Sequence, residues 1–247
     1  NGRVVWKKEN AGTSAPVVVG GEVVVTQKEA RGNKSYEGLK RLDAARGADK
    51  DKALLASDKA VYLDENKGGG VALKQEAVQA LDSSVGFAQA PAAAELGAAN
   101  RHLGVKTVVG GWAYQGSRAA YGNGRMMNAQ GRYLNSVNAS DGGVAWRAEV
   151  SGAGVAEGAQ VFSPPALGDR FMYLSSAHGH LLSVRQHDGE VGFAYLFNQP
   201  MVFQPALAEG NVYVGTSNGL LICLKTGSRD ADGWYAWGGN AEHNKNK

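Results

Sequence analysis

Short runs of β-favouring residues recur along the chain, each preceded by turn-forming residues. Three of them are VVV at 23–25, FMYL at 171–174 and VYV at 212–214. Next to Gly-Gly, Gly-Asp and Glu-Gly pairs, such runs predict β-hairpins. A further apolar run, a turn and an aromatic-bearing run follow each later hairpin; the turns are Asp141-Gly142, Asp188-Gly189 and Thr226-Gly227, and the aromatics include Trp146 and Phe193. The pattern predicts units of about four short antiparallel strands.

These units repeat. The segment 165–189 aligns with 205–227 at an offset of 40 residues, and the Asp-Gly turn of an earlier copy at 119–142 precedes the next one by 47 residues. A weaker copy covers 16–47, which brings the number of visible units to four. One sheet of short strands buries too little apolar surface, so the units must stack, and radial stacking gives a β-propeller. The predicted fold is all-β, a propeller of four-stranded antiparallel blades.

An insertion interrupts the repeat. We expect propeller blades at 1–47 and 112–247, separated by an insertion at 48–111. Within it, residues 59–64 favour a strand, and apolar residues at helical spacing predict a helix over 71–81. A second short helix is predicted at 91–96, where Pro91 occupies a first-turn position. The insertion either covers one propeller face as a lid or docking element, or packs on a blade edge without a binding role.

Composition and charge narrow the function classes. The chain has 247 residues, 35 of them glycine and 6 proline, which suits many tight turns. Its net charge is only +3, and we interpret the basic residues between 28 and 52 as a solvated face. No nucleic-acid partner is expected, because Tyr36 is the only aromatic residue interleaved there. No apolar run is long enough for a transmembrane segment. The lone Cys223 excludes an internal disulfide.

Few residues suggest chemistry. His178 and His180 flank Gly179 and are weak candidates for a metal site, although a solvent-exposed hairpin tip is the simpler interpretation. Three aromatics near the end of the chain could form a stacking platform for a sugar or a quinone, or could pack between blades; they are Trp234, Tyr235 and Trp237. No phosphate-binding loop and no Gly-x-Ser-x-Gly elbow occurs. No catalytic residue is predicted.

The repeat resembles that of the quinoprotein propellers, the family named after pyrroloquinoline quinone (PQQ). The similarity lies in the order of proline, turn, apolar-Tyr-apolar strand, glycine, apolar strand and Asp-Gly or Thr-Gly turn. The runs GGVAW at 142–146 and GRVVW at 2–6 resemble its tryptophan-bearing outer strand, and 232–244 resembles its closing segment. The resemblance implies a ring of about seven or eight blades. We expect the missing blades to precede Asn1, or another copy of the chain to supply them.

Fold alone does not choose a function in this family, which contains quinone-dependent dehydrogenases and non-catalytic relatives such as the lipoprotein of the outer-membrane assembly machinery. The adjacent-cysteine disulfide of some of the enzymes cannot form with Cys223 alone. The leading hypothesis is therefore a non-catalytic, cofactor-free binding or scaffolding module for a protein or envelope component, located in the periplasm or elsewhere outside the cytoplasm by analogy. The alternatives are an oxidoreductase that uses PQQ with calcium and has part of its site outside this chain, and a glycan-binding propeller.

Overall fold

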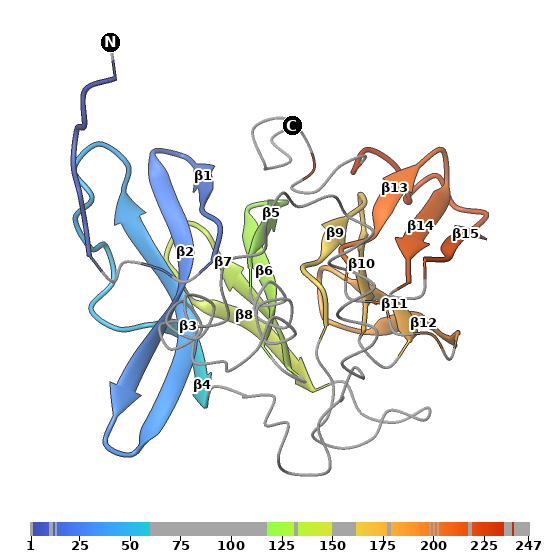
Figure 1. The fold of residues 1–247 in the computed structure, drawn as a ribbon, viewed down its shortest axis with the longest axis horizontal. Helices are drawn as coiled ribbons and strands as arrows, with labels where there is room; N and C mark the ends of the chain where they lie inside the picture. The colour runs from blue at the N-terminus through green and yellow to red at the C-terminus, as the bar shows by residue number, and fades with distance from the viewer. Residues whose placement is uncertain are drawn as a thin grey trace.

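In a computed structural model of the chain, four antiparallel sheets follow one another in sequence order (Figure 1). The structure describes residues 2–9, 12, 14–59, 118–130, 133–149, 162–176, 179–197, 199, 201, 203–216, 219–234 and 239. Each sheet is a meander in which every strand pairs with the next one along the chain. The first sheet lies at one end of the row and the last at the other (Figure 1). The predicted propeller blades are confirmed.

We name the sheets blades 1 to 4. Blade 1 contains β1 (Val17–Val19), β2 (Glu22–Arg31), β3 (Lys34–Asp43) and β4 (Leu55–Lys59). Blade 2 contains β5 (Ala120–Gly122), β6 (Arg125–Gln130), β7 (Tyr133–Asn138) and β8 (Val144–Glu149). Blade 3 contains β9 (Ala166–Leu167), β10 (Phe171–Ser175), β11 (His180–Arg185) and β12 (Val191–Leu196). Blade 4 contains β13 (Ala206–Ala208), β14 (Asn211–Gly215) and β15 (Leu221–Lys225), and within the described residues it has no fourth strand.

The first hairpins turn at the predicted residues. Gly20-Gly21, Asn123-Gly124 and Glu209-Gly210 each have two consecutive positive φ angles, between 52° and 76°. This is the backbone of the type I′ turn, whose twist matches that of paired strands. Side chains from successive sheets meet between the blades, where one apolar cluster joins blades 2, 3 and 4 and a second joins blades 1 and 2. The core is thus a series of blade-to-blade layers.

The strand registers align the blades residue by residue. Both complete later blades have a bulge before the outer strand, between Ser136 and Val137 in blade 2 and between Ser183 and Val184 in blade 3. From the paired residues of the second and third strands, four leucines occupy one equivalent position; they are Leu39, Leu134, Leu181 and Leu221. The exposed fraction of a side chain can therefore be compared between blades at matched positions.

The first blade extends past residue 47, where its boundary was predicted, because β4 pairs with β3 and completes the blade as far as Lys59. The strand of β4 has the sequence LASDK, in which polar residues obscure any alternation, so the pattern gave no signal. The predicted helices at 71–81 and 91–96 lie outside the described residues, as does most of the strand predicted at 59–64. No helix in the described part of the chain is long and apolar enough to cross a membrane.

Blade junctions and a candidate protein-binding edge

A tryptophan from the outer strand of blade 2 locks blade 2 to blade 3. The indole Nε1 of Trp146 donates a hydrogen bond of 2.8 Å to the carbonyl of Gln186. Its ring lies against Gly189, where an added Cβ would be 2.9 Å from Cε3 of the indole. Gly189 also has a φ of +81°, which L side chains rarely adopt. Only glycine gives the ring this close approach.

Trp6 repeats the same junction at the other end of the described chain. Its Nε1 donates a hydrogen bond of 2.8 Å to the carbonyl of Ala44. Its ring lies against Gly47, where an added Cβ would be 2.6 Å from Cε3 of the indole. In both junctions the acceptor precedes the glycine by three residues. The segment that contains Trp6 therefore occupies, against blade 1, the place that β8 occupies against blade 3.

Arg41 replaces the tryptophan between blades 1 and 2. Its Nη1 donates 2.8 Å to the carbonyl of Ala139, three residues before Gly142. An added Cβ at Gly142 would be 2.9 Å from Nη2 of Arg41, so the guanidinium packs on this glycine as the indoles pack on theirs. Arg41 lies on β3, the third strand of its blade, whereas Trp146 lies on the outer strand β8. The donor at this junction therefore comes from a different strand, although the acceptor is again a backbone carbonyl three residues before a glycine.

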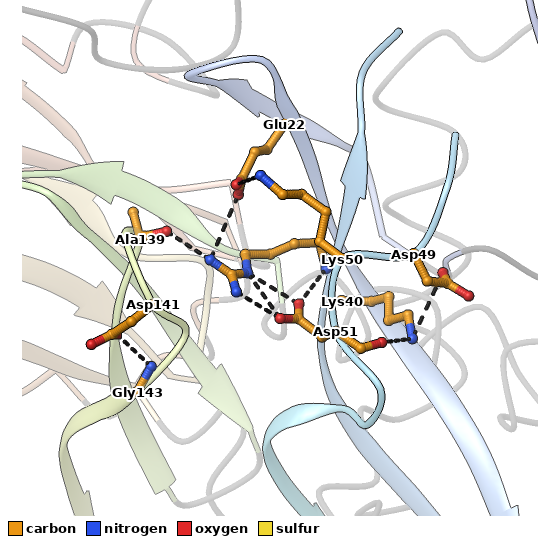
Figure 2. A network of polar contacts seen from close by, with 9 residues as sticks. Glu22, Lys40, Asp49, Lys50, Asp51, Ala139, Asp141 and Gly143 are labelled. Atoms are coloured by element: carbon orange, nitrogen blue, oxygen red, sulfur yellow. Dashed lines mark hydrogen bonds and ion pairs between the residues drawn. The ribbon is translucent and has the colours of Figure 1, made fainter. Parts of the chain in front are cut away.

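A network of charges holds this guanidinium in place (Figure 2). Asp51 accepts bonds of 3.0 Å from Nε and 2.6 Å from Nη2 of Arg41, and both side chains are buried. These bonds, more than the opposing effect of burial, raise the pKa of Arg41. Lys40 donates 2.7 Å to the backbone carbonyl of Asp51, and Glu22 pairs with Lys50 beside it. A bidentate Arg–carboxylate pair of this kind is geometrically specific.

The interpretation of the basic stretch as a solvated face is wrong for Lys40 and Arg41, which are both buried. Their charges are compensated by acidic residues that follow β3 in the sequence. The physical reason is that Arg41 contacts a backbone carbonyl and a glycine of blade 2, as the tryptophans do at the other junctions, so it lies between two blades.

An aspartate ties the end of blade 4 to blade 3. The carboxylate of Asp230 accepts hydrogen bonds from the backbone N–H groups of Arg170 and Phe171 and, at 3.1 Å, from the hydroxyl of Tyr173. Burial and, after it, the negative charge of Asp230 raise the pKa of Tyr173 well above its ordinary value. The phenol therefore remains a donor at neutral pH.

Of the predicted site residues, the structure describes His180 and Trp234. His180 begins β11 and is buried, with its backbone N–H donating 3.1 Å to the hydroxyl of Ser176, so it is not at a solvent-exposed tip. Trp234 is 1% exposed; its carbonyl accepts 2.8 Å from the N–H of Leu207, and it belongs to the core between the blades. His178, Tyr235 and Trp237 lie outside the described residues. The described residues contain no group of three or more His, Cys, Asp or Glu side chains that could hold a metal ion.

The outer strand of blade 3 is the candidate binding site that the sequence analysis missed. β12 is an edge strand whose six residues, VGFAYL, include no charge. Val191, Tyr195 and Leu196 are each about half exposed. Aromatic rings line one face of this edge, with centroids 5.1 Å apart between Phe193 and Tyr195 and 6.3 Å apart between Tyr195 and Phe197. Natural edge strands usually carry charges that discourage pairing with another chain.

β4 and β8, the outer strands of blades 1 and 2, do carry charged residues. On β8, Arg147 lies over the ring of Tyr133 at 4.1 Å and pairs with Asp58 of β4, so two edges share one ion pair. The distinguishing signal of β12 is therefore an uncharged outer strand, which is visible in the sequence only once its position at the edge is known.

A protein-family model described as outer membrane protein assembly factor BamB matches residues 1–228. The chain belongs to this family. Among solved structures, BamB from Moraxella catarrhalis is 12% identical, with 87% of this chain and 47% of that chain covered and a TM-score of 0.48. The computationally designed protein Ika4 is 7% identical, with 90% and 95% covered and a TM-score of 0.48. The chain thus spans about half the length of the Moraxella BamB. No curated protein matches it in sequence.

Proposed function

We propose that the chain is a non-catalytic propeller of the BamB family that binds a protein of the cell envelope outside the cytoplasm, and that the edge of β12 receives an extended segment of this partner. The observation that carries the proposal is the uncharged, half-exposed edge of β12. Membership of an assembly-factor family supports a protein as the partner. The rigid blade junctions support a scaffold that presents this edge in a fixed position.

Strand addition suits the chemistry of this edge. An edge strand presents backbone N–H and C=O groups along its free side, and each new hydrogen bond contributes about 0.5–1.5 kcal/mol net. Side chains alternate between the faces of the sheet, and the bulge between Ser183 and Val184 shifts this alternation by one residue. Val191 and Leu196 would therefore contact one face of an added strand and Tyr195 the other. Pockets for alternate side chains give such complexes their specificity.

The edge is also preorganised. The hydroxyl of Ser183 accepts 3.0 Å from the N–H of Phe193, and an added Cβ at Gly192 would lie 2.6 Å from this hydroxyl oxygen. β12 is therefore held tightly against β11 along its inner side. A partner strand would add to an ordered edge and would not need to order it first, which lowers the entropic cost of binding.

A matched pair of charge substitutions tests the proposal. Val191 on β12 and Val144 on β8 occupy equivalent positions, opposite Val184 and Val137, and are 46% and 51% exposed. Binding of the purified chain to outer-membrane assembly components of the same organism would be measured by biolayer interferometry. We expect Val191→Lys to weaken binding by about tenfold or more, equal to about 1.4 kcal/mol, and Val144→Lys to leave it unchanged.

Equal effects of the two substitutions would contradict the assignment to β12. A parallel titration with PQQ and Ca²⁺, read by calorimetry and by reduction of an artificial electron acceptor, tests the catalytic alternative. Tight binding with turnover would overturn the non-catalytic proposal, whereas binding of a protein partner without turnover supports it.

A further inference from the structure

The face of blade 2 that meets blade 1 carries a polar pair at a position where blades 3 and 4 are apolar. Asn128 of β6 lies directly opposite Asn135 of β7, and the two residues are 1% and 0% exposed. Counted from the first pair of each hairpin, the equivalent pairs are Leu174 with Leu182 in blade 3 and Val214 with Ile222 in blade 4. Blade 2 thus buries two amides where the later repeats have hydrocarbon side chains.

The neighbouring Gln130 of β6 points in the same direction as this pair. Because side chains alternate along a strand, Gln130 shares its face of the sheet with Met126, and Asn135 shares the same face with Val137. Met126 and Val137 belong to the apolar cluster that also contains Leu39 of blade 1. Gln130, which is 4% exposed, and Asn135 therefore point into the junction between blades 1 and 2.

Both amides have buried polar atoms without a hydrogen-bond partner in the described part of the chain. These atoms are Nδ2 and Oδ1 of Asn135 and Nε2 and Oε1 of Gln130. An unpaired buried donor or acceptor costs free energy, and nearly all such groups in native proteins bond to protein or to ordered water. A partner from outside the polypeptide therefore fits this junction.

We propose that the junction between blades 1 and 2 is a hydration site, in which ordered water bridges the amides of Asn135 and Gln130. Gln130 pairs with Tyr133, so it is the diagonal neighbour of Asn135, and such neighbours lie about 7–8 Å apart. A bridging water suits this separation. A buried water makes about three hydrogen bonds, and the two amides supply both donors and acceptors for them. Water fits better than an ion, because both amides are uncharged.

A row of polar side chains connects this site to the surface. Arg147 of β8 lies opposite Asn135 on the same sheet, and it forms an ion pair with Asp58 of β4. The side chains of Arg147 and Asp58 are 31% and 33% exposed, so this end of the row reaches solvent. Water enters from the edge between β4 and β8, and the ion pair covers the entrance.

A high-resolution crystal structure of the full 247-residue chain tests the proposal directly. We expect a water within about 3.2 Å of a polar atom of Asn135 and of a polar atom of Gln130. Direct hydrogen bonds of these two amides to each other or to blade 1, with no water between them, overturn the proposal.

Magnetic relaxation dispersion of water nuclei tests it in solution, since this method counts long-lived internal waters. Asn135→Leu with Gln130→Met replaces both amides by apolar side chains of similar shape, a change that is often nearly neutral for stability. We expect this double variant to lose at least one long-lived water. Asn33→Leu, in the exposed turn between β2 and β3, is the control and should leave the count unchanged.

An unchanged count in the double variant overturns the hydration site, as does an equal loss in Asn33→Leu. If the double variant does not fold, the crystal structure of the wild type still decides. Binding of a partner at β12 does not depend on this site, so each proposal can fail without the other.

Discussion

Substitution of Gly189 by alanine measures how much the tryptophan junction depends on its glycine. Two costs add. The φ of +81° costs an L residue about 1–2 kcal/mol. The new Cβ would lie 2.9 Å from Cε3 and 3.0 Å from Cζ3 of Trp146, and overpacking of this kind costs about 1–3 kcal/mol. We expect Gly189→Ala to lower the free energy of unfolding by about 2–5 kcal/mol in total.

Gly124 provides the matched control. It also has a positive φ, of +71°, but an added Cβ there would meet nothing within 4 Å. Gly124→Ala should therefore cost only the backbone contribution, about 1–2 kcal/mol. The difference between the two alanine variants isolates the contact with the indole, about 1–3 kcal/mol. Urea unfolding followed by circular dichroism measures both variants.

A double-mutant cycle completes the test. In a Trp146→Leu background the indole is absent, so Gly189→Ala should cost no more than Gly124→Ala, and the coupling energy should equal the lost contact. If Gly189→Ala and Gly124→Ala destabilise the protein equally, or if the extra cost persists without the indole, the proposed junction does not hold blades 2 and 3 together.

Three further substitutions, one of them a control, probe the polar contacts near the blade junctions, again by urea unfolding. Asp51→Asn leaves the buried guanidinium of Arg41 with only the more distant carboxylate of Glu22, at 3.9 Å, and should cost about 3 kcal/mol. Asp49→Asn, at a 46% exposed side chain, should cost less than about 1 kcal/mol. Because the folded-state pKa of Tyr173 is raised above its unfolded value, the stability that this phenol contributes is fully present below about pH 10 and is lost as pH rises towards the folded pKa. Between about pH 8 and about pH 11, the wild type should therefore lose more stability than Tyr173→Phe; equal losses would refute the assignment to this phenol.

Local chemistry determines the parts of the fold that could be predicted. The hairpins at Asn123-Gly124 and Glu209-Gly210 could be predicted from the residues of the turns and of the apolar runs beside them. Positive φ and strand propensity depend on residues that are adjacent in the sequence. The repeat then implied stacked blades. The strand β4 could not be found in this way, because its residues are mostly polar and its pairing with β3 depends on tertiary context.

The junctions were harder to predict, because each joins residues far apart in the chain. Arg41 and its acceptor Ala139 are separated by 98 residues, and nothing near Arg41 in the sequence distinguishes it from the other basic residues of its stretch. The burial of Trp234 depends likewise on its pairing with Leu207 of β13. Resemblance to a repeat identified Trp6 and Trp146 as outer-strand residues, but the glycines that receive them became evident only from the structure.

At the blade junctions, the tryptophan and arginine side chains contact a backbone carbonyl and a glycine, and they do not depend on the side chain of the acceptor residue. The acceptors are Ala44, Ala139 and Gln186, which share no chemistry beyond the main chain. When a repeat is duplicated, deleted or exchanged, the new neighbouring blade therefore still offers the carbonyl and the glycine that the flanking blade contacts. No compensating substitution is needed at the acceptor. The number of blades in such a protein can change in evolution more readily than the contacts between them.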